Sequence, residues 1–328
     1  MDSSTLGRAL RPFAKTLALG AILLGGLAQA QTATVRLIVG YPPGGGTDAI
    51  ARILAEKLQD ALGSSVMVEN RSGAGGQISA QVLKAAAPDG NTFLLSHAHT
   101  ISILPLVVKN PGFDPAKDFV AVAGVATYVD AFAVSNGTPA KSLNEYVAWV
   151  RTQGAGKDTV GIPAPASVPE FLVKLIGQKY ALDLQSAPYR GSGPMMGDML
   201  GNQIHAGVGS VQDFIENHRA GRLRVVAVLG HERQAAMPDV PTLAELGIAG
   251  FDDVPYYGVF APAATPKAAL ERFSKALAKV LALPEVRERL IAMGVTVGFT
   301  TGAQLAARER AYTQTWARII KASGFQAQ

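Results

Sequence analysis

A glycine-rich turn at residues 41–48, with the sequence YPPGGGTD, constrains the fold of this chain more than any other feature. It follows the apolar run 35–39, which is typical of a strand, and precedes a helical pattern at 49–62. The three glycines allow a sharp bend that exposes backbone N–H groups, and Thr47 or Asp48 offers an N-cap. Because the start of a helix has unpaired donors and a positive dipole end, the turn favours binding of a carboxylate or another small anion.

The first 30 residues have the pattern of a secretory signal peptide. Arg8, Arg11 and Lys15 precede the apolar segment 17–27, and an Ala-Gln-Ala site ends the pattern at Ala30. The apolar segment is shorter than the roughly 20 residues that span a bilayer, so an uncleaved anchor is the weaker alternative. We therefore expect residues 1–30 to be removed and the mature protein to be periplasmic.

Composition excludes several classes of protein. The chain has no cysteine, so disulfides and a lipid-modified N-terminal cysteine are excluded. The net charge of +5 is spread along the chain without a run of Lys or Arg, which argues against a nucleic-acid partner. Hydrophobic residues make up 48% of the sequence, enough for one large or two medium domains. We expect a monomer.

Two further loops follow predicted strands in the first part of the chain. The strand at 66–68 leads to ENRSGAGG at 69–76, and the strand at 92–95 leads to SHAHT at 96–100. Strands alternating with helices predict βαβ units and a mostly parallel sheet. Because ligands of such sheets bind beyond the carboxyl ends of the strands, all three loops are candidates for a binding site.

A second α/β unit begins near Asp130. Its pattern again alternates strands and helices, and it includes a short helix predicted at 241–246. A strand predicted at 256–261 follows, and three amphipathic helices end the chain.

Seven segments together are specific enough to identify a family. They read VRLIVGYPPGGGTDAIAR, VENRSGAGG, PDGNTFLL, APYRGSGPMMGDMLGNQI, AGRLRVVAV, MPDVPTLAELGIAGF and YYGVFAPAATP. Their order and spacing resemble the Bug (TctC) family, the periplasmic solute-binding receptors of tripartite tricarboxylate transporters. The resemblance covers nearly the whole chain after residue 30.

The resemblance implies a fold, a function and partners. The implied fold is the α/β type II periplasmic-binding-protein architecture, in which two lobes joined by two crossing strands enclose a ligand cleft. Lobe 1 is then 31–130 with 261–328, and lobe 2 is 131–260. The implied function is capture of a small carboxylate and its delivery to large and small integral-membrane permease subunits, without enzymatic activity, cofactor or metal.

The candidate site residues come from the loops at the strand ends. Those that the resemblance places on a ligand carboxylate, in the first two turns, are Tyr41, Pro42, Gly44, Gly45, Gly46, Thr47, Asp48, Ser72, Gly73, Ala74 and Gly75. Those in the later loops are Ser96, His97, Thr100, Ala164, Ser167, Tyr189, Gly209 and Ser210.

Lobe 2 departs from the family pattern. The chain has Ala164-Pro165-Ala166-Ser167 where the family has a sequence close to Gly-x-Gly-Ser, and Val208-Gly209 where Phe-Asp is common. We therefore expect a cleft without the acid that would meet an ammonium group. An apolar or aromatic monocarboxylate is then favoured over citrate, with a dicarboxylate as the rival and amino acids last.

Other interpretations are weaker. His97 and His99 lack a third ligand at metal-site spacing, so we expect no metal. The Gly-Val-Gly-Ser run ending at Ser210 lacks the second glycine of a nucleophile elbow, which disfavours a hydrolase. The first turn has no GK[ST] and is not a P-loop. We expect Tyr256 and Tyr257 to pack in the core or at a hinge, with lining of the cleft as the weaker alternative. Docking of the liganded receptor on a signalling kinase is an alternative to transport.

Overall fold

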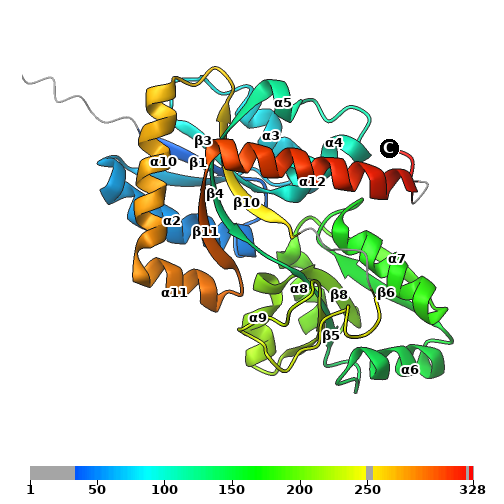
Figure 1. Cartoon of the computed structure of the whole chain (residues 1–328). Helices are drawn as coiled ribbons and strands as arrows, with labels where there is room; N and C mark the ends of the chain where they lie inside the picture. The colour runs from blue at the N-terminus through cyan, green and yellow to red at the C-terminus, as the bar shows by residue number, and fades with distance from the viewer. Residues whose placement is uncertain (1–33, 249–253, 323–324, 328) are drawn as a thin grey trace, which may run out of the picture. The chain divides into compact units, whose positions relative to one another are not determined.

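A six-stranded and a five-stranded sheet organise the described part of the chain, residues 34–248, 254–322 and 325–327 of a computed structural model (Figure 1). The described residues from 34 onward belong to one compact unit. The predicted signal peptide at 1–30 lies outside the described residues.

The first sheet forms the core of lobe 1. Its strands, in spatial order, are β11 (Thr296–Thr301), β4 (Phe119–Thr127), β10 (Tyr256–Pro262), β3 (Thr92–His97), β1 (Val35–Val39) and β2 (Val66–Asn70). Side chains alternate across the sheet, so that Leu37 packs in one apolar cluster and Ile38 in the other.

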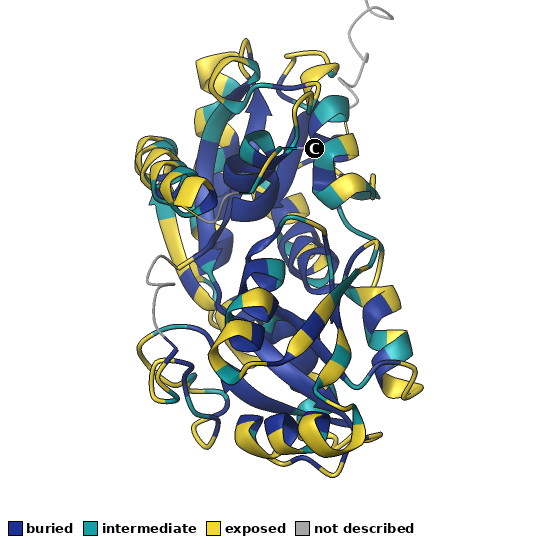
Figure 2. Cartoon of the chain, turned by 90° about the vertical axis from the view of Figure 1, so that its right-hand side faces the viewer, coloured by how far each residue is buried: buried dark blue, intermediate teal, exposed yellow. Residues whose placement is uncertain are grey.

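Helices cover both faces of the first sheet. Those that share the cluster of Leu37 are α2 (Gly46–Leu62), α10 (Lys267–Ala282) and α11 (Pro284–Ala292). Those on the other side are α3 (Gln77–Lys84), the π-helical turn η2 (His99–Ile103), α4 (Leu104–Val107) and the long C-terminal α12 (Gly302–Ala322). A 3-10 turn η1 (Ala74–Gly76) precedes α3, and α5 (Pro115–Asp118) precedes β4. In Figure 2 the inner strands are mostly buried, and the exposed residues lie on the outer faces of the helices, in loops and on edge strands.

The second sheet forms lobe 2. Its order is β7 (Asp183–Pro188), β6 (Lys157–Ile162), β8 (Ala206–Ser210), β5 (Asp130–Ser135) and β9 (Leu223–Val228). The helices of this lobe are α6 (Leu143–Gln153), α7 (Val168–Tyr180), α8 (Ser192–Leu200) and α9 (Val211–Arg219). The C-terminal helix α12 reaches this lobe, where Trp316 contacts Phe171 of α7 with 5.7 Å between ring centroids.

The chain crosses between the lobes at two adjoining segments. Strand β4 ends at Thr127 in the first sheet, and β5 begins at Asp130 in the second. The backbone N–H of Tyr128 donates to the carbonyl of Pro255, 3.2 Å away, just before β10 begins in the first sheet. Because the two crossings are hydrogen-bonded to each other, they form a single hinge region. The lobe boundaries given above remain predictions.

Two sequence predictions about secondary structure are wrong. The sheets are mixed and not mostly parallel, because β10 runs antiparallel to β3 and β4, and β5 runs antiparallel to β8 and β9. The helix predicted at 241–246 is a turn. Thr242 and Glu245 cap each other there, but Thr242 also bridges to Val228 and Gly247 follows at φ +73°, which leaves no room for a second helical turn.

Candidate ligand-binding cleft

The first glycine-rich turn is held by a buried carboxylate. Asp48 accepts hydrogen bonds from the backbone N–H of Gly44 at 3.0 Å, from Nε of Arg52 at 2.9 Å and from Nδ2 of Asn70 at 2.9 Å. Burial would raise the pKa of Asp48, but these donors outweigh it and hold the pKa below its ordinary value. Asp48 therefore stays ionised and ties the turn to the end of β2.

The second glycine-rich turn is held by hydrogen bonds to its backbone from other loops of lobe 1. Its glycines have positive φ, which is +137° at Gly73 and +64° at Gly75. The carbonyl of Gly75 accepts from the hydroxyl of Tyr41 at 3.1 Å and from that of Thr100 at 2.9 Å. Arg71, before the turn, pairs with Glu69 on β2. The hydroxyls of Tyr41 and Thr100 are thus already used to join the loops of lobe 1.

A cavity of about 620 Å³, partly open to solvent, lies between the lobes. Lobe 1 and the hinge contribute Tyr41, Pro42, Gly45, Gly46, Thr47, His97, His99, Tyr128, Tyr257 and Tyr312. Lobe 2 and the start of β5 contribute Asp130, Pro163, Ala164, Ser167, Val168, Pro169, Ser192, Ser210 and Asp213.

A second, more open cavity adjoins the first. It shares Tyr41 and Pro163 with the main cavity. The rest of its lining is Gly40, Gly73, Ala74, Gly75, Pro165, Pro188, Tyr189, Arg190 and Gly191. The two glycine-rich turns therefore face neighbouring cavities, the first turn the main one and the second turn the adjoining one.

The site residues predicted from the sequence divide into three groups. The main cavity is lined by Tyr41, Pro42, Gly45, Gly46, Thr47, His97, Ala164, Ser167 and Ser210. The adjoining cavity is lined by Tyr41, Gly73, Ala74, Gly75 and Tyr189. Those that line neither of these two cavities are Gly44, Asp48, Ser72, Ser96, Thr100 and Gly209.

Ser96, Thr100 and Gly209 of the third group are buried, whereas Gly44 and Ser72 are exposed. Ser96 is buried within β3, and Thr100 is fully buried beneath Gly75. Gly209 packs against Met195 and Phe214, where an added Cβ would lie 3.4 Å from both side chains. Tyr189, in the adjoining cavity, donates its hydroxyl proton to Oδ2 of Asp198 at 2.6 Å.

Asp213 is a cleft residue that the sequence analysis missed. Its Oδ1 accepts from the hydroxyl of Ser192 at 2.8 Å and from the backbone N–H of Gly46 at 3.1 Å, and its Oδ2 accepts from the N–H of Ser210 at 3.2 Å. Burial raises the pKa of Asp213, and these hydrogen bonds offset part of the rise. The Ser-x-x-Asp pattern beginning at Ser210, which caps α9, is the sequence signal that predicts this placement.

Asp130 is the second missed acid. It is 4% exposed, and Oγ of Ser210 donates to its Oδ1 over 3.4 Å. Burial, followed by the charge of Asp213, raises the pKa of Asp130 to about 7. A single acid within the apolar run from Val129 to Phe132 is the signal that could have indicated it. The expectation that the cleft lacks an acid to meet an ammonium group is therefore wrong.

The histidines of the cleft carry no positive charge near neutral pH. Burial lowers the pKa of His97 to about 3, with a further contribution from His99, and burial lowers that of His99 to about 4. His97 stacks on Tyr41 at 4.8 Å between ring centroids and meets Tyr257 edge-on at 5.6 Å. Tyr257 packs in the apolar core of lobe 1, as predicted, and it also lines the cleft. Among the described residues no group of three or more His, Cys, Asp or Glu is placed to hold a metal.

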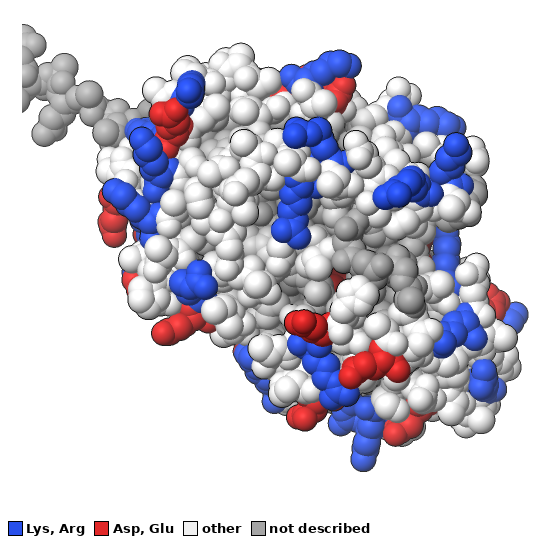
Figure 3. All heavy atoms as spheres, viewed as in Figure 1, with Lys and Arg blue, Asp and Glu red and all other residues white. Residues whose placement is uncertain are grey.

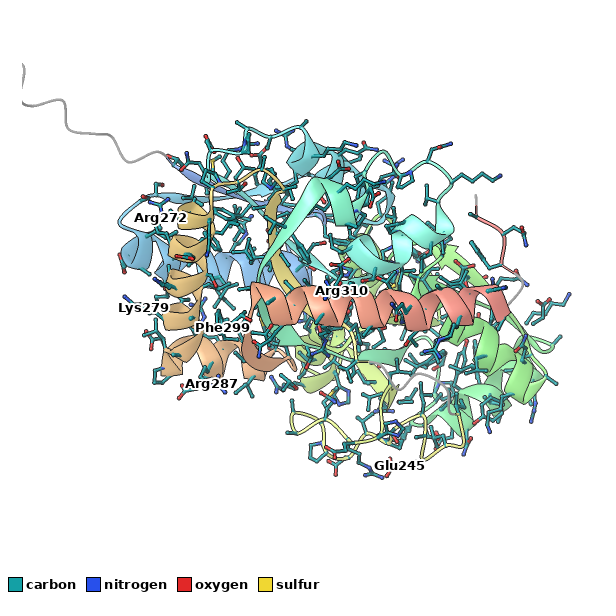
Figure 4. The ribbon with its side chains drawn as sticks, turned by 45° about the horizontal axis from the view of Figure 1, so that its top comes forward. Glu245, Arg272, Lys279, Arg287, Phe299 and Arg310 are labelled. Carbon is teal, nitrogen blue, oxygen red and sulfur yellow. The ribbon has the colours of Figure 1, made fainter. Side chains whose placement is uncertain are left out.

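Positive charges lie on the outer surface. On the face shown in Figure 3, Lys and Arg are scattered among Asp and Glu over both lobes. Arg272 and Lys279 on α10 and Arg287 on α11 are exposed along the outside of lobe 1 in Figure 4. No Lys or Arg is among the described residues that line the main cavity, so its fixed charges are those of the two aspartates.

Two α/β lobes that enclose a lined cavity at a two-segment hinge define the class of two-lobed solute-binding proteins. The family model described as "Tripartite tricarboxylate transporter family receptor" matches residues 50–325, so the chain belongs to this family. Its members are solute-binding receptors and not enzymes. The predicted family and fold class are confirmed.

Individual relatives agree with this assignment. Protein BugT of Bordetella pertussis is 31% identical over 295 residues, which cover 88% of this chain and 89% of BugT. The structure of the periplasmic binding protein BugD superposes with a TM-score of 0.84 at 29% identity, over 90% of this chain and 99% of BugD. A Rhodopseudomonas palustris protein solved with adipate gives a TM-score of 0.83 at 26% identity, over 89% of this chain and 98% of that protein.

Proposed function

We propose that this protein is a periplasmic receptor that captures a small carboxylate in the interlobe cleft and delivers it to the membrane subunits of a tripartite tricarboxylate-type transporter. The observation that carries the proposal is the cavity lined by both lobes in a chain of this receptor family. The adipate in the related structure supports a carboxylate as the class of solute.

Closure of the lobes explains how such a receptor would signal that it is loaded. A ligand shifts the balance between open and closed forms only by the difference in its contacts with the two forms. In this cleft Thr47 belongs to lobe 1 and Ser167 to lobe 2, and both line the same cavity. A solute held between them stabilises the closed form, which the large and small permease subunits would recognise.

Periplasmic location is supported by the predicted signal peptide and by the periplasmic relative BugD. No helix among the described residues has the length and apolar character needed to cross a membrane. Mass spectrometry of the exported protein should find its N-terminus within a few residues of position 31. A mature chain that still begins at Met1 would argue against export by this route.

Uptake of the bound acid by cells tests whether the receptor delivers it to a membrane transporter. Cells that lack the receptor should lose uptake of the acid that the purified protein binds, and the gene supplied in trans should restore it. If the purified protein binds the acid but the deletion strain still takes it up normally, the protein does not serve in transport of that acid.

A further inference from the structure

Asp130 is a buried carboxylate that lines the main cavity and has few partners within the protein. It is 4% exposed, and among the described residues the one side chain that donates to it is Ser210, over 3.4 Å. An ionised carboxylate has about four acceptor positions, and a buried one that leaves most of them unused is costly. The cavity therefore leaves acceptor capacity to be filled by a ligand.

Asp213 is a second acid in the same cavity, but it accepts more hydrogen bonds than Asp130 does. It accepts three hydrogen bonds, from Ser192, Gly46 and Ser210, so its own oxygens are largely used. Its charge still acts on Asp130. The lining histidines are neutral and none of the described lining residues is Lys or Arg, so no cationic side chain of the described lining balances these acids.

Aromatic rings surround the acids. Tyr41, Tyr128, Tyr257 and Tyr312 line the cavity, and the rings of Tyr128 and Tyr257 lie 4.8 Å apart. The faces of tyrosine rings attract cations, most strongly where water is excluded. Rings and carboxylates in one cavity therefore favour a positively charged group over an apolar one.

His99 is another lining residue with a polar atom that no described residue pairs with. It is 7% exposed and lines the cavity, and its Nδ1 has no hydrogen-bond partner in the structure. A buried ring nitrogen without a partner is costly unless a ligand or water pairs with it.

The adjoining cavity is lined by backbone hydrogen-bond donors and an arginine, in contrast to the acidic main cavity. The second glycine-rich turn, from Gly73 to Gly75, and Arg190 line it, and Tyr41 lines both cavities. Backbone donors and a guanidinium favour a carboxylate there. The two cavities together form a cleft with an acidic end and a donor-rich end.

We propose that Asp130 and the tyrosine rings bind the ammonium group of a zwitterionic solute, so that this receptor selects carboxylates that also carry a positive amine. The proposal rests on the proposed receptor function and specifies its solute. A polyanion such as citrate would meet two buried carboxylates without a cation to balance them, and an apolar monocarboxylate would leave Asp130 without a partner.

Calorimetry with defined probes tests the proposal. The amino acids are glutamate, aspartate, 4-aminobutanoate, 5-aminopentanoate and glycine betaine, and the acids without a cation are butanoate, pentanoate, adipate, citrate and benzoate. The proposal predicts that the tightest ligand carries a cation and binds at least tenfold better than any acid without one. A tightest ligand without a cation overturns the inference but leaves the receptor function intact, whereas binding of none of the probes overturns both.

Asp130→Asn keeps the shape of the side chain and removes its charge. Affinity for the best amino acid should fall at least tenfold, while the weaker binding of its matched acid without an amine should be unchanged or improved. The control is Asp60→Asn on the exposed face of α2, which should bind like the parent. Unchanged amino-acid affinity in a folded Asp130→Asn protein contradicts the proposal.

Proton release gives a second test that needs no variant. An ammonium group beside Asp130 favours its ionised form, so binding near pH 7 should release protons, measured as the dependence of the binding heat on the buffer. The other titratable groups that line the cavity are Tyr41, His97, His99, Tyr128, Asp213, Tyr257 and Tyr312. The pKa values of the two histidines lie well below this range, and those of Tyr41, Tyr128 and Tyr257 lie well above it. Proton uptake would show that a protonated Asp130 donates to a ligand carboxylate and would overturn the proposal.

Discussion

The backbone N–H of Gly46 donates a hydrogen bond to Oδ1 of Asp213, 3.1 Å away, and so joins two residues 167 positions apart in different lobes. Gly46 is the first residue of α2, Asp213 lies in the first turn of α9, and Ser192, which also donates to Asp213, begins α8. Three helix starts thus converge on one protein carboxylate. The first turn was predicted to donate to a ligand anion, but one of its N–H groups donates to this carboxylate of the protein instead. The contact closes the cleft at this edge.

Gly46→Ala should prevent that closure. An added Cβ would lie 2.4 Å from Cγ of Gln212 and 3.1 Å from Oδ1 of Asp213, although the backbone of Gly46 itself tolerates alanine. We expect the lobes to remain apart, with a larger radius of gyration by small-angle scattering and affinity at least tenfold lower, or about 1.4 kcal/mol.

The matched control is Gly193→Ala, because an added Cβ there meets no atom within 4 Å. It should scatter and bind like the parent. A Gly46→Ala protein as compact as the parent would show that this contact does not hold the lobes together.

Asp48→Asn tests the role of Asp48 as a support for the first turn. The amide would place an N–H group against at least one of the donors of Gly44, Arg52 and Asn70, which leaves a buried donor unpaired. The free energy of unfolding should fall by about 1–3 kcal/mol in urea denaturation. Asp60→Asn is the control, since Asp60 is exposed on the same helix; equal stability of the two variants would contradict the assigned role.

The raised pKa of Asp130 predicts a specific pH dependence of stability. The pKa of Asp130 is raised from its ordinary value of 3.8 to about 7 in the folded protein, so the folded protein binds more protons than the unfolded chain between these pH values. The contribution of Asp130 to stability therefore falls as pH rises from about 4 to about 7, by at most about 4 kcal/mol.

Asp130→Asn should remove this contribution. Relative to the parent, the variant should be more stable at pH 8 than at pH 5, as measured by urea denaturation at both values. A difference between variant and parent that does not change with pH would show that Asp130 ionises at its ordinary pKa.

The local elements of lobe 1 are predictable from sequence because their signals are local. Strand β1 is a short apolar run, and α2 carries Ile50, Ile53, Leu54 and Leu58 on one buried face before Gly63 ends it at φ +62°. Strand β11 gives no such signal, because its edge position leaves most of its residues exposed. The antiparallel pairing of β10 was also unpredictable, since its neighbours β3 and β4 are more than 120 positions away.

The cleft was less predictable than the fold. The turn residues were found because glycine and N-cap patterns are visible in a short window. Asp130 and Asp213 became cleft residues only through the crossing of β5 and the placement of α9, which bring together residues 83 positions apart. Their absence from the sequence analysis produced the wrong expectation about charge and, with it, the preference for an apolar acid.

Calorimetric titration of the purified exported protein with the panel of carboxylates is the most direct test of the account. The account predicts that at least one acid binds one-to-one with micromolar or tighter affinity, and that Gly46→Ala weakens this binding at least tenfold. A protein that is folded by circular dichroism and binds none of the acids would contradict the claim that this cleft is a carboxylate receptor.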